Sequence, residues 1–347
     1  MVAQGSLEAL VKVQILAGQP NNPFGRGRRP WRLPQCPMIP AILATFLFCI
    51  SAVSATKATR YLGGISANFW RLLLATILLG FWSHLCAHGI AGKGFAMFFM
   101  SGVVGFGLGD LALYQALPRL GSRLTLMLVH CVAAPSAAFA EWVCLGTVLT
   151  VPEIASTFCI LFGVTVALYP ASVGHGKAMT SGMDVTGVFY GLVAAVGQGV
   201  GAAMSRVAYN INAAEGISID GLTAAYQRAL GGLLLAGMAM IALRRFTAFY
   251  GDSMNRRSYG TPNLTGHARN AFPWIICTAL TGPTLGIGCY QWALEKTPSG
   301  LVLPIVATTP LVVIPLSAWM EGDRPSPRFI AGGLVAVLGV VLLGQSS

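Results

Sequence analysis

The residue that points most clearly to chemistry is Asp110, which lies in the apolar stretch SGVVGFGLGDLALYQAL. An ionised carboxylate at the depth of a membrane interior costs ~2.5–3.5 kcal/mol or more, so its side chain must face protein or water. Two interpretations are open. Asp110 is either a carboxylate that binds a proton or a substrate, or a structural acid that pairs with Arg71 or caps a helix.

His130 lies in a second apolar stretch, LMLVHCVAAP. A histidine can relay protons near neutral pH because its charge changes there. A lone histidine on an apolar helix is more often a hydrogen-bonded packing residue, so this interpretation stays open beside the first. Asp110 and His130 would form a proton relay if their side chains face each other.

Two arginines, Arg71 and Arg228, each stand near the start of an apolar segment. One interpretation is a clamp for a substrate carboxylate or phosphate, since the guanidinium group binds such anions through two parallel hydrogen bonds. The other is a side chain that extends to the lipid headgroups. Their occurrence at matching positions of the two halves of the chain favours an architectural role.

Further polar residues within apolar segments are Tyr114, Gln198, Tyr290 and Gln291. Tyrosine and glutamine side chains in membrane segments either line a cavity or form hydrogen bonds between helices. Gln198 lies within the glycine cluster GQGVG, and breaks in transporter helices often lie beside the binding site. We therefore include all four among the candidate pathway residues.

The composition places these residues in a membrane protein. Of the 347 residues, 55% are hydrophobic and 10% are charged, and 22 basic against 11 acidic residues give a net charge of +11. A soluble domain averages about 25% charged residues, so an ordinary soluble enzyme, a nucleic-acid-binding protein and a disordered scaffold are excluded. The basic residues fall mostly between apolar stretches, where they meet lipid headgroups.

No cofactor or metal is expected. The eight cysteines form no C-x-x-C pair, and His84 and His88 alone do not make a metal site. GFGLG and GQGVG place glycines four residues apart, a spacing typical of closely packed helices. They are not nucleotide-binding loops, because no Lys-Ser/Thr pair follows. The expected partners are a small-molecule substrate and the lipid bilayer, with no nucleic acid.

Residues 1–37 are predicted to form a flexible basic tail, which five prolines keep from being helical. Met38 begins the first apolar segment directly and is an alternative start. After the tail, ten apolar segments are long enough to cross a membrane as helices. They are 38–56, 64–84, 94–117, 122–145, 151–170, 185–209, 220–243, 271–293, 299–320 and 328–344.

The second half of the chain repeats the first. YQAL at 114–117 corresponds to YQWAL at 290–294, and Pro135 corresponds to Pro310. The segment 151–168 likewise matches 326–343, and 69–80 matches 226–237. Each half holds five predicted spans. Because five is odd, two such halves in one membrane must be inverted relative to each other, as in many secondary transporters.

The stretch 290–343 resembles the second half of an EamA-type transporter of the drug/metabolite transporter superfamily. The resemblance lies in Pro310, the Glu-x-x-Arg-Pro turn (Glu321, Arg324, Pro325) and the glycine-rich last span. The first half is more loosely similar: Glu141 is present but the Arg-Pro pair is missing. The resemblance covers roughly residues 38–345 and implies ten helices and the movement of small metabolites.

We therefore expect an all-α integral membrane protein with ten transmembrane helices in two inverted five-helix repeats. The expected regions are the tail 1–37, a first repeat 38–170 and a second repeat 185–347. The expected function is secondary transport of a small metabolite by alternating access, with proton coupling as a further hypothesis. The alternatives are an integral-membrane lipid-modifying enzyme and a structural membrane protein without transport; we favour the non-enzyme. The expected setting is a bacterial inner membrane, as monomer or homodimer.

The orientation in the membrane receives two opposing signals. The tail carries five basic residues and the connection 244–270 carries another five. Seven predicted spans separate them, so they lie on opposite faces, and a rule that places positive loops in the cytoplasm cannot satisfy both. The family resemblance implies that both termini are cytoplasmic, and we follow that expectation.

Overall fold

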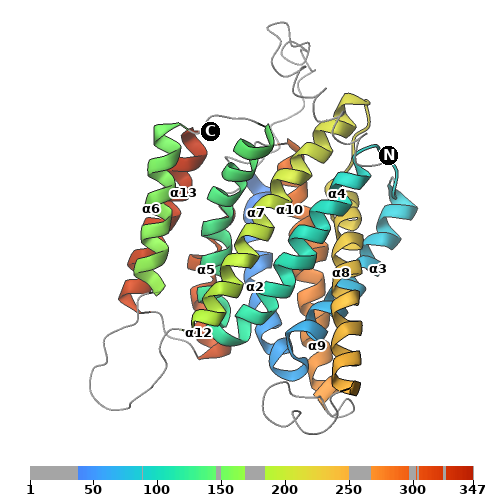
Figure 1. Ribbon diagram of the computed structural model, residues 1–347, viewed down its shortest axis with the longest axis horizontal. Helices are drawn as coiled ribbons and strands as arrows, with labels where there is room; N and C mark the ends of the chain where they lie inside the picture. The colour runs from blue at the N-terminus through green and yellow to red at the C-terminus, as the bar shows by residue number, and fades with distance from the viewer. Residues whose placement is uncertain are drawn as a thin grey trace, which may run out of the picture.

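The computed structural model describes residues 38–87, 89–145, 150–168, 184–249, 267–296, 302, 305–322 and 326–346, and the predicted tail lies outside this part of the chain. Every regular element in the described part is a helix (Figure 1). Six helices are long and apolar enough to cross a membrane, and two shorter apolar helices cover 154–167 and 327–342. The prediction of an all-helical membrane protein is confirmed.

The longest helix of the first half, α5 (Asp110–Leu145), is kinked within its length. The helix α5 includes Gly121, whose φ of 76° is outside the helical region, so α5 consists of two helical segments that meet at a kink. This agrees with the expected boundary between the segments 94–117 and 122–145. The elements are α2 (Met38–Leu62), α3 (Gly64–Cys86), α4 (Phe95–Gly102), η2 (Val103–Gly109), α5 (Asp110–Leu145) and α6 (Val151–Leu168).

The second half corrects two expectations. The helix that was expected to end at 243 continues to Phe249, which shortens the long connection. The expected continuous span 299–320 is interrupted by a turn at 307–308, and its last helix starts with Pro310 in the first turn, where proline's missing N–H is tolerated. The elements are α7 (Val185–Ala214), α8 (Gly221–Phe249), α9 (His267–Ala279), η3 (Leu280–Thr284), α10 (Leu285–Lys296), α12 (Thr309–Glu321) and α13 (Pro327–Ser346).

Two π-helical segments occupy matching places in the two halves. The segment η2 is followed by the Tyr114-Gln115 pair, and η3 is followed by the Tyr290-Gln291 pair. Glycines in η2 and Pro283 in η3 weaken the regular helical hydrogen-bond pattern there. Such wide turns are frequent at functional sites. Glycine-rich composition predicted close packing here, and the widened turn was not expected.

The two halves of the chain interlock along the length of the bundle. At one edge α6 packs with α13, and at the opposite edge α3 packs with α8 (Figure 1). Between these edges α5 packs along α7, while α2 packs along α9 and α10. Each of these pairs joins the first half to the second, so the interior is a seam between the halves.

Glycine makes the closest approaches in this seam possible, as the sequence predicted. A Cβ atom added at Gly102 would lie 1.8 Å from the carbonyl oxygen of Arg228. At the α6–α13 contact, a Cβ added at Gly163 would lie 2.4 Å from the backbone nitrogen of Ala336. No side chain fits at such distances, so the backbones pack directly against each other.

Exposed basic residues gather at one end of the bundle. This is the end that contains the α2–α3 turn, the kink of α5, the end of α8 and the starts of α9 and α13. The exposed arginines there are Arg60, Arg119, Arg244, Arg245, Arg269 and Arg328. At the other end, Lys93 pairs with Glu215 at 2.8 Å, which joins the α3–α4 turn to the α7–α8 turn.

Two glycines of α8 provide a test of this packing. We expect Gly231→Ala to lower the thermal unfolding midpoint sharply, because the new Cβ would lie 2.1 Å from the carbonyl oxygen of Phe99. Gly237→Ala is the matched control, since its nearest neighbour is 3.8 Å away. We expect Gly237→Ala to leave the free energy of unfolding unchanged or to raise it by roughly 0.5–1 kcal/mol, because glycine is an unfavourable residue inside a helix. Equal midpoints for the two purified variants would contradict the described packing of α8 on α4.

Candidate functional site

A cavity of about 90 Å³ lies in the seam between the two halves. Its walls come from α2, α3, η2 and α5 of the first half and from α7, η3 and α10 of the second half. The space can hold several water molecules. Six of the eight candidate residues line it: Arg71, Asp110, Tyr114, His130, Gln198 and Tyr290.

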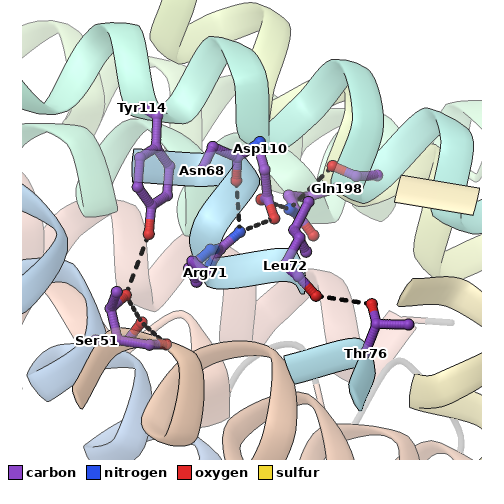
Figure 2. Close-up of polar contacts among 10 residues, drawn as sticks. Ser51, Asn68, Arg71, Leu72, Thr76, Asp110, Tyr114 and Gln198 are labelled. Carbon is purple, nitrogen blue, oxygen red and sulfur yellow. Dashed lines mark hydrogen bonds and ion pairs between the residues drawn. The ribbon is translucent and has the colours of Figure 1, made fainter. Parts of the chain in front are cut away.

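The centre of the site is an ion pair between Arg71 and Asp110, which are 5% and 3% exposed (Figure 2). Nη2 of Arg71 donates to Oδ2 of Asp110, and Nε2 of Gln198 donates to Oδ1 of the same carboxylate at 2.9 Å. Both carboxylate oxygens are therefore satisfied. Arg71 belongs to the first half and Gln198 to the second, so Asp110 connects the two halves.

Local structure explains how these groups meet. Asp110 is the first residue after η2, so the widened turn sets where its carboxylate points. Asn68 stands one helical turn before Arg71 on α3, and its Oδ1 accepts a hydrogen bond from Nη2 of Arg71 at 3.0 Å. The arginine is thereby held between an amide and a carboxylate. A buried pair with this many hydrogen bonds is well positioned, although desolvation offsets much of its attraction.

A second line of contacts runs from the arginine across the seam. The guanidinium carbon of Arg71 lies 4.7 Å from the ring centroid of Tyr114, a cation–π contact. The Tyr114 hydroxyl is 3.1 Å from Oγ1 of Thr278, which is 3.0 Å from Oγ of Ser51 (Figure 2). Tyr114 thus combines both expected roles, since it lines the cavity and links helices.

His130 lines the same cavity as Asp110 but does not bond to it. Its ring stacks on Phe48 with centroids 5.6 Å apart and an angle of 20° between the planes. Among the described residues no hydrogen bond joins His130 to Asp110. The sequence left a relay open on the condition that the two side chains face each other, and without a direct contact any proton passage between them would need water in the cavity.

The remaining candidates lie at or behind the cavity wall. Tyr290 lines the cavity, with its ring edge-on to Phe48. Gln291 is fully buried outside the cavity, and its Nε2 donates to Oγ of Ser205 at 3.4 Å. Arg228 also does not line the cavity; its guanidinium carbon lies 4.8 Å from the ring centroid of Phe106, which does.

Neither arginine extends to the lipid headgroups, which corrects one of the two sequence interpretations. Arg71 is 5% exposed and Arg228 is 1% exposed. A Cβ added at Gly282 of η3 would lie 3.3 Å from Nη1 of Arg71, and one at Gly105 of η2 would lie 3.0 Å from Nη2 of Arg228. The arginine of each half therefore lies against the π-helix of the other half.

Sequence reasoning missed several residues of the site. Asn68 could have been found, because it precedes Arg71 by three residues on the same helix face. Ser51, Thr278 and the aromatic Phe48 and Phe106 carry no such signal, since small hydroxyl and aromatic residues are common throughout membrane helices. In the described part of the chain, no group of three His, Cys, Asp or Glu side chains is placed to hold a metal ion.

The comparisons with known proteins agree with this architecture. The model of the EamA-like transporter family matches the chain twice, over residues 37–169 and 185–345. The chain belongs to this family, whose members are transporters, and it is a multi-pass integral membrane protein with two repeats. The family resemblance stated from residues 290–343 is confirmed.

Similar bacterial proteins are about one repeat long. A Pseudomonas aeruginosa (strain UCBPP-PA14) protein named "Probable 4-amino-4-deoxy-L-arabinose-phosphoundecaprenol flippase subunit ArnE" is 30% identical over 119 residues, which are 34% of this chain and 95% of that protein. The protein of the same name from Pseudomonas paraeruginosa is 28% identical over the same length. A solved crystal structure shares the fold with a TM-score of 0.55 and 16% identity, covering 88% of this chain and 95% of that one.

Neutralising Asp110 should lower the free energy of unfolding by more than neutralising Arg71. Asp110→Asn leaves two buried arginines without a carboxylate, and removing one partner of a buried pair typically costs about 3–5 kcal/mol. In Arg71→Gln, the Asp110 carboxylate still interacts with the positive charge of Arg228. This variant should therefore lose less stability than Asp110→Asn. The double variant should be more stable than Asp110→Asn alone. Thermal unfolding of the three purified variants checks this order; a double variant no more stable than Asp110→Asn would contradict it.

Proposed function

We propose that this protein is a secondary transporter that moves a small solute through the seam between its halves by alternating access. The observation that carries the proposal is the cavity, which both halves line and which contains the Arg71–Asp110 pair. Buried polar groups beside a cavity at the interface of two repeats are the usual arrangement of a transporter binding site. The proposal includes that the protein is not an enzyme.

The proposed topology is ten transmembrane helices in two inverted repeats, residues 38–170 and 185–347. Equivalent turns support the inversion. Gly63 joins α2 to α3 with a φ of 74°, and Gly216 joins α7 to α8 with a φ of 73°. The Lys93–Glu215 pair sets the second turn beside the far end of α3, opposite to Gly63. The matching π-helices and the reciprocal arginine contacts fit the same symmetry.

Proton coupling through Asp110 is the second part of the proposal. Among the described residues that line the cavity, Asp110 is the carboxylate. Its two oxygens are held by Arg71 and by Gln198, which belong to different halves. Movement of the halves would therefore change the surroundings of the carboxylate, which is how a buried acid takes up and releases a proton during a transport cycle.

A lipid-linked solute is the second candidate cargo. A groove of about 710 Å³ lies between α3, α8 and α10, and its lining includes the exposed Trp82, Leu285 and Trp292. The groove is mostly apolar, with Asp220 and Glu295 also in its lining. Its exposed tryptophans suit a hydrocarbon chain near the membrane surface. The flippase subunits named above are similar to one third of this chain. The bacterial origin of these relatives supports placement in an inner membrane.

Uptake into proteoliposomes tests the function of Asp110. We expect the wild type to accumulate part of a labelled metabolite mixture, and Asp110→Asn to abolish this accumulation because the carboxylate is lost. The Arg71→Gln/Asp110→Asn double variant separates function from folding, since it should regain stability and still fail to transport. Transport by the double variant at the wild-type rate would limit Asp110 to a structural role.

The same vesicles distinguish transport from enzymatic action. A transporter returns the solute chemically unchanged, whereas a lipid-modifying enzyme alters lipid or solute in open detergent solution. Lys93→Gln is a suitable control variant, because its exposed side chain lies far from the cavity. It should transport like the wild type. Chemical conversion without accumulation would replace the transporter proposal by the enzyme alternative.

The orientation prediction follows from the exposed arginines. We propose that their end of the bundle faces the cytoplasm, because positive residues are retained there; this departs from the orientation that the family resemblance implies. In a variant without native cysteines, a cysteine at position 93 should react with an impermeant thiol reagent from outside the cell, and one at 245 should not. The reverse pattern would contradict the proposal. Repeating the labelling without residues 1–37 isolates the effect of their five basic residues.

A further inference from the structure

Arg228 is a buried charged side chain of the seam that forms no ion pair within the described part of the chain. It is 1% exposed, and no hydrogen-bond partner among the described residues reaches its Nε or Nη1 atoms. Its ring contact is the cation–π contact with Phe106. Arg71, its counterpart in the first half, is held by Asp110 and Asn68. The two arginines thus occupy matching positions with different partners.

The repeat explains why the partner is missing. Asp110 precedes Tyr114 by four residues, and the residue four before Tyr290 is Gly286. The second half therefore has no carboxylate where the first half has one. Next to the cavity, among the described residues, Arg71 and Arg228 supply two positive charges and Asp110 supplies one negative charge. One positive charge is left over in a region that lipid and protein shield from water.

The surplus charge lies one side chain away from the cavity. Phe106 and Tyr290 both line the cavity. The guanidinium group of Arg228 lies over the Phe106 ring in a cation–π contact. Tyr290 and Asp110 are the cavity residues that interact electrostatically with Arg228. The Phe106 side chain therefore stands between the cavity and the unused guanidinium donors of Arg228. Nε and Nη1 each form a donor fork with Nη2 of the same guanidinium group, and such forks match the geometry of carboxylates and phosphates.

We infer that Arg228 binds the negatively charged group of the solute, so that the cargo of this protein carries a carboxylate or a phosphate. The inference rests on the proposed transport function and adds the chemical class of its cargo. The anion would pair with Arg228 in the second half, as Asp110 pairs with Arg71 in the first half. Binding of the anion neutralises the unpaired positive charge of Arg228. The same chemistry is supplied by a free solute or by the phosphate of a lipid headgroup.

The test measures anion binding without transport. The full-length protein in detergent is unfolded by heat in sodium phosphate, sodium acetate or sodium chloride at equal ionic strength. A second arm compares nanodiscs of phosphatidylcholine with nanodiscs that also contain phosphatidylglycerol. We expect phosphate, acetate or the anionic lipid to raise the midpoint by several degrees over the chloride or neutral-lipid reference, because a ligand that binds the folded state stabilises it. A raised midpoint with phosphate or acetate identifies a free solute as the source of the anionic group, and a raised midpoint with the anionic lipid identifies a lipid headgroup.

Two variants decide whether Arg228 is responsible. Arg228→Gln should lose the shift, while Lys93→Gln, which removes an exposed positive charge, should keep it. If Arg228→Gln fails to fold, Arg228→Lys replaces it; this variant keeps the charge but loses the planar fork, and we expect a reduced shift. An undiminished shift in the Arg228 variant, or no shift of the wild type in either arm, overturns the inference. Because no transport is measured, a protein that binds anions but moves nothing would count against the proposed function alone.

Discussion

The structure depends on how charged side chains are kept inside a bundle that lipid surrounds. An isolated ion at that depth is costly, and Arg71 and Asp110 avoid much of the cost by sharing hydrogen bonds with each other and with Asn68 and Gln198. These partners come from α3, α5 and α7. The hydrogen bond from Gln198 joins this ion pair to the second half, so a movement of one half against the other acts directly on the Asp110 carboxylate.

The two halves use one scaffold for different purposes. Both have a π-helical turn before a Tyr-Gln pair, and both place an arginine against the π-helix of the other half. Only the first half adds an acid, Asp110, where the second has Gly286. Duplication accounts for what the halves share, including direct backbone contacts at glycines such as Gly102. The difference between them places a single carboxylate, Asp110, in the wall of a mostly apolar cavity.

The membrane class, the helix positions and the duplicated halves could be predicted from the sequence, because long apolar segments and repeated Tyr-Gln, Arg and Pro positions are local signals. The burial of both arginines could not, because a position near the end of an apolar segment does not show how far the side chain reaches. Whether His130 and Asp110 face each other was left open. The answer depends on how helices rotate against each other, which a single sequence does not record.

The central claim is that the seam between the halves opens in turn to each side of the membrane. A single cysteine at position 130, in a protein otherwise free of cysteine, tests it most directly, since this residue lines the cavity. Right-side-out and inside-out membrane vesicles that contain the protein are each treated with a membrane-impermeant thiol reagent. The account predicts labelling from both faces, and faster labelling from one face when the other is blocked by a bound solute. A cysteine that reacts from neither face would show a closed, static core and contradict the account.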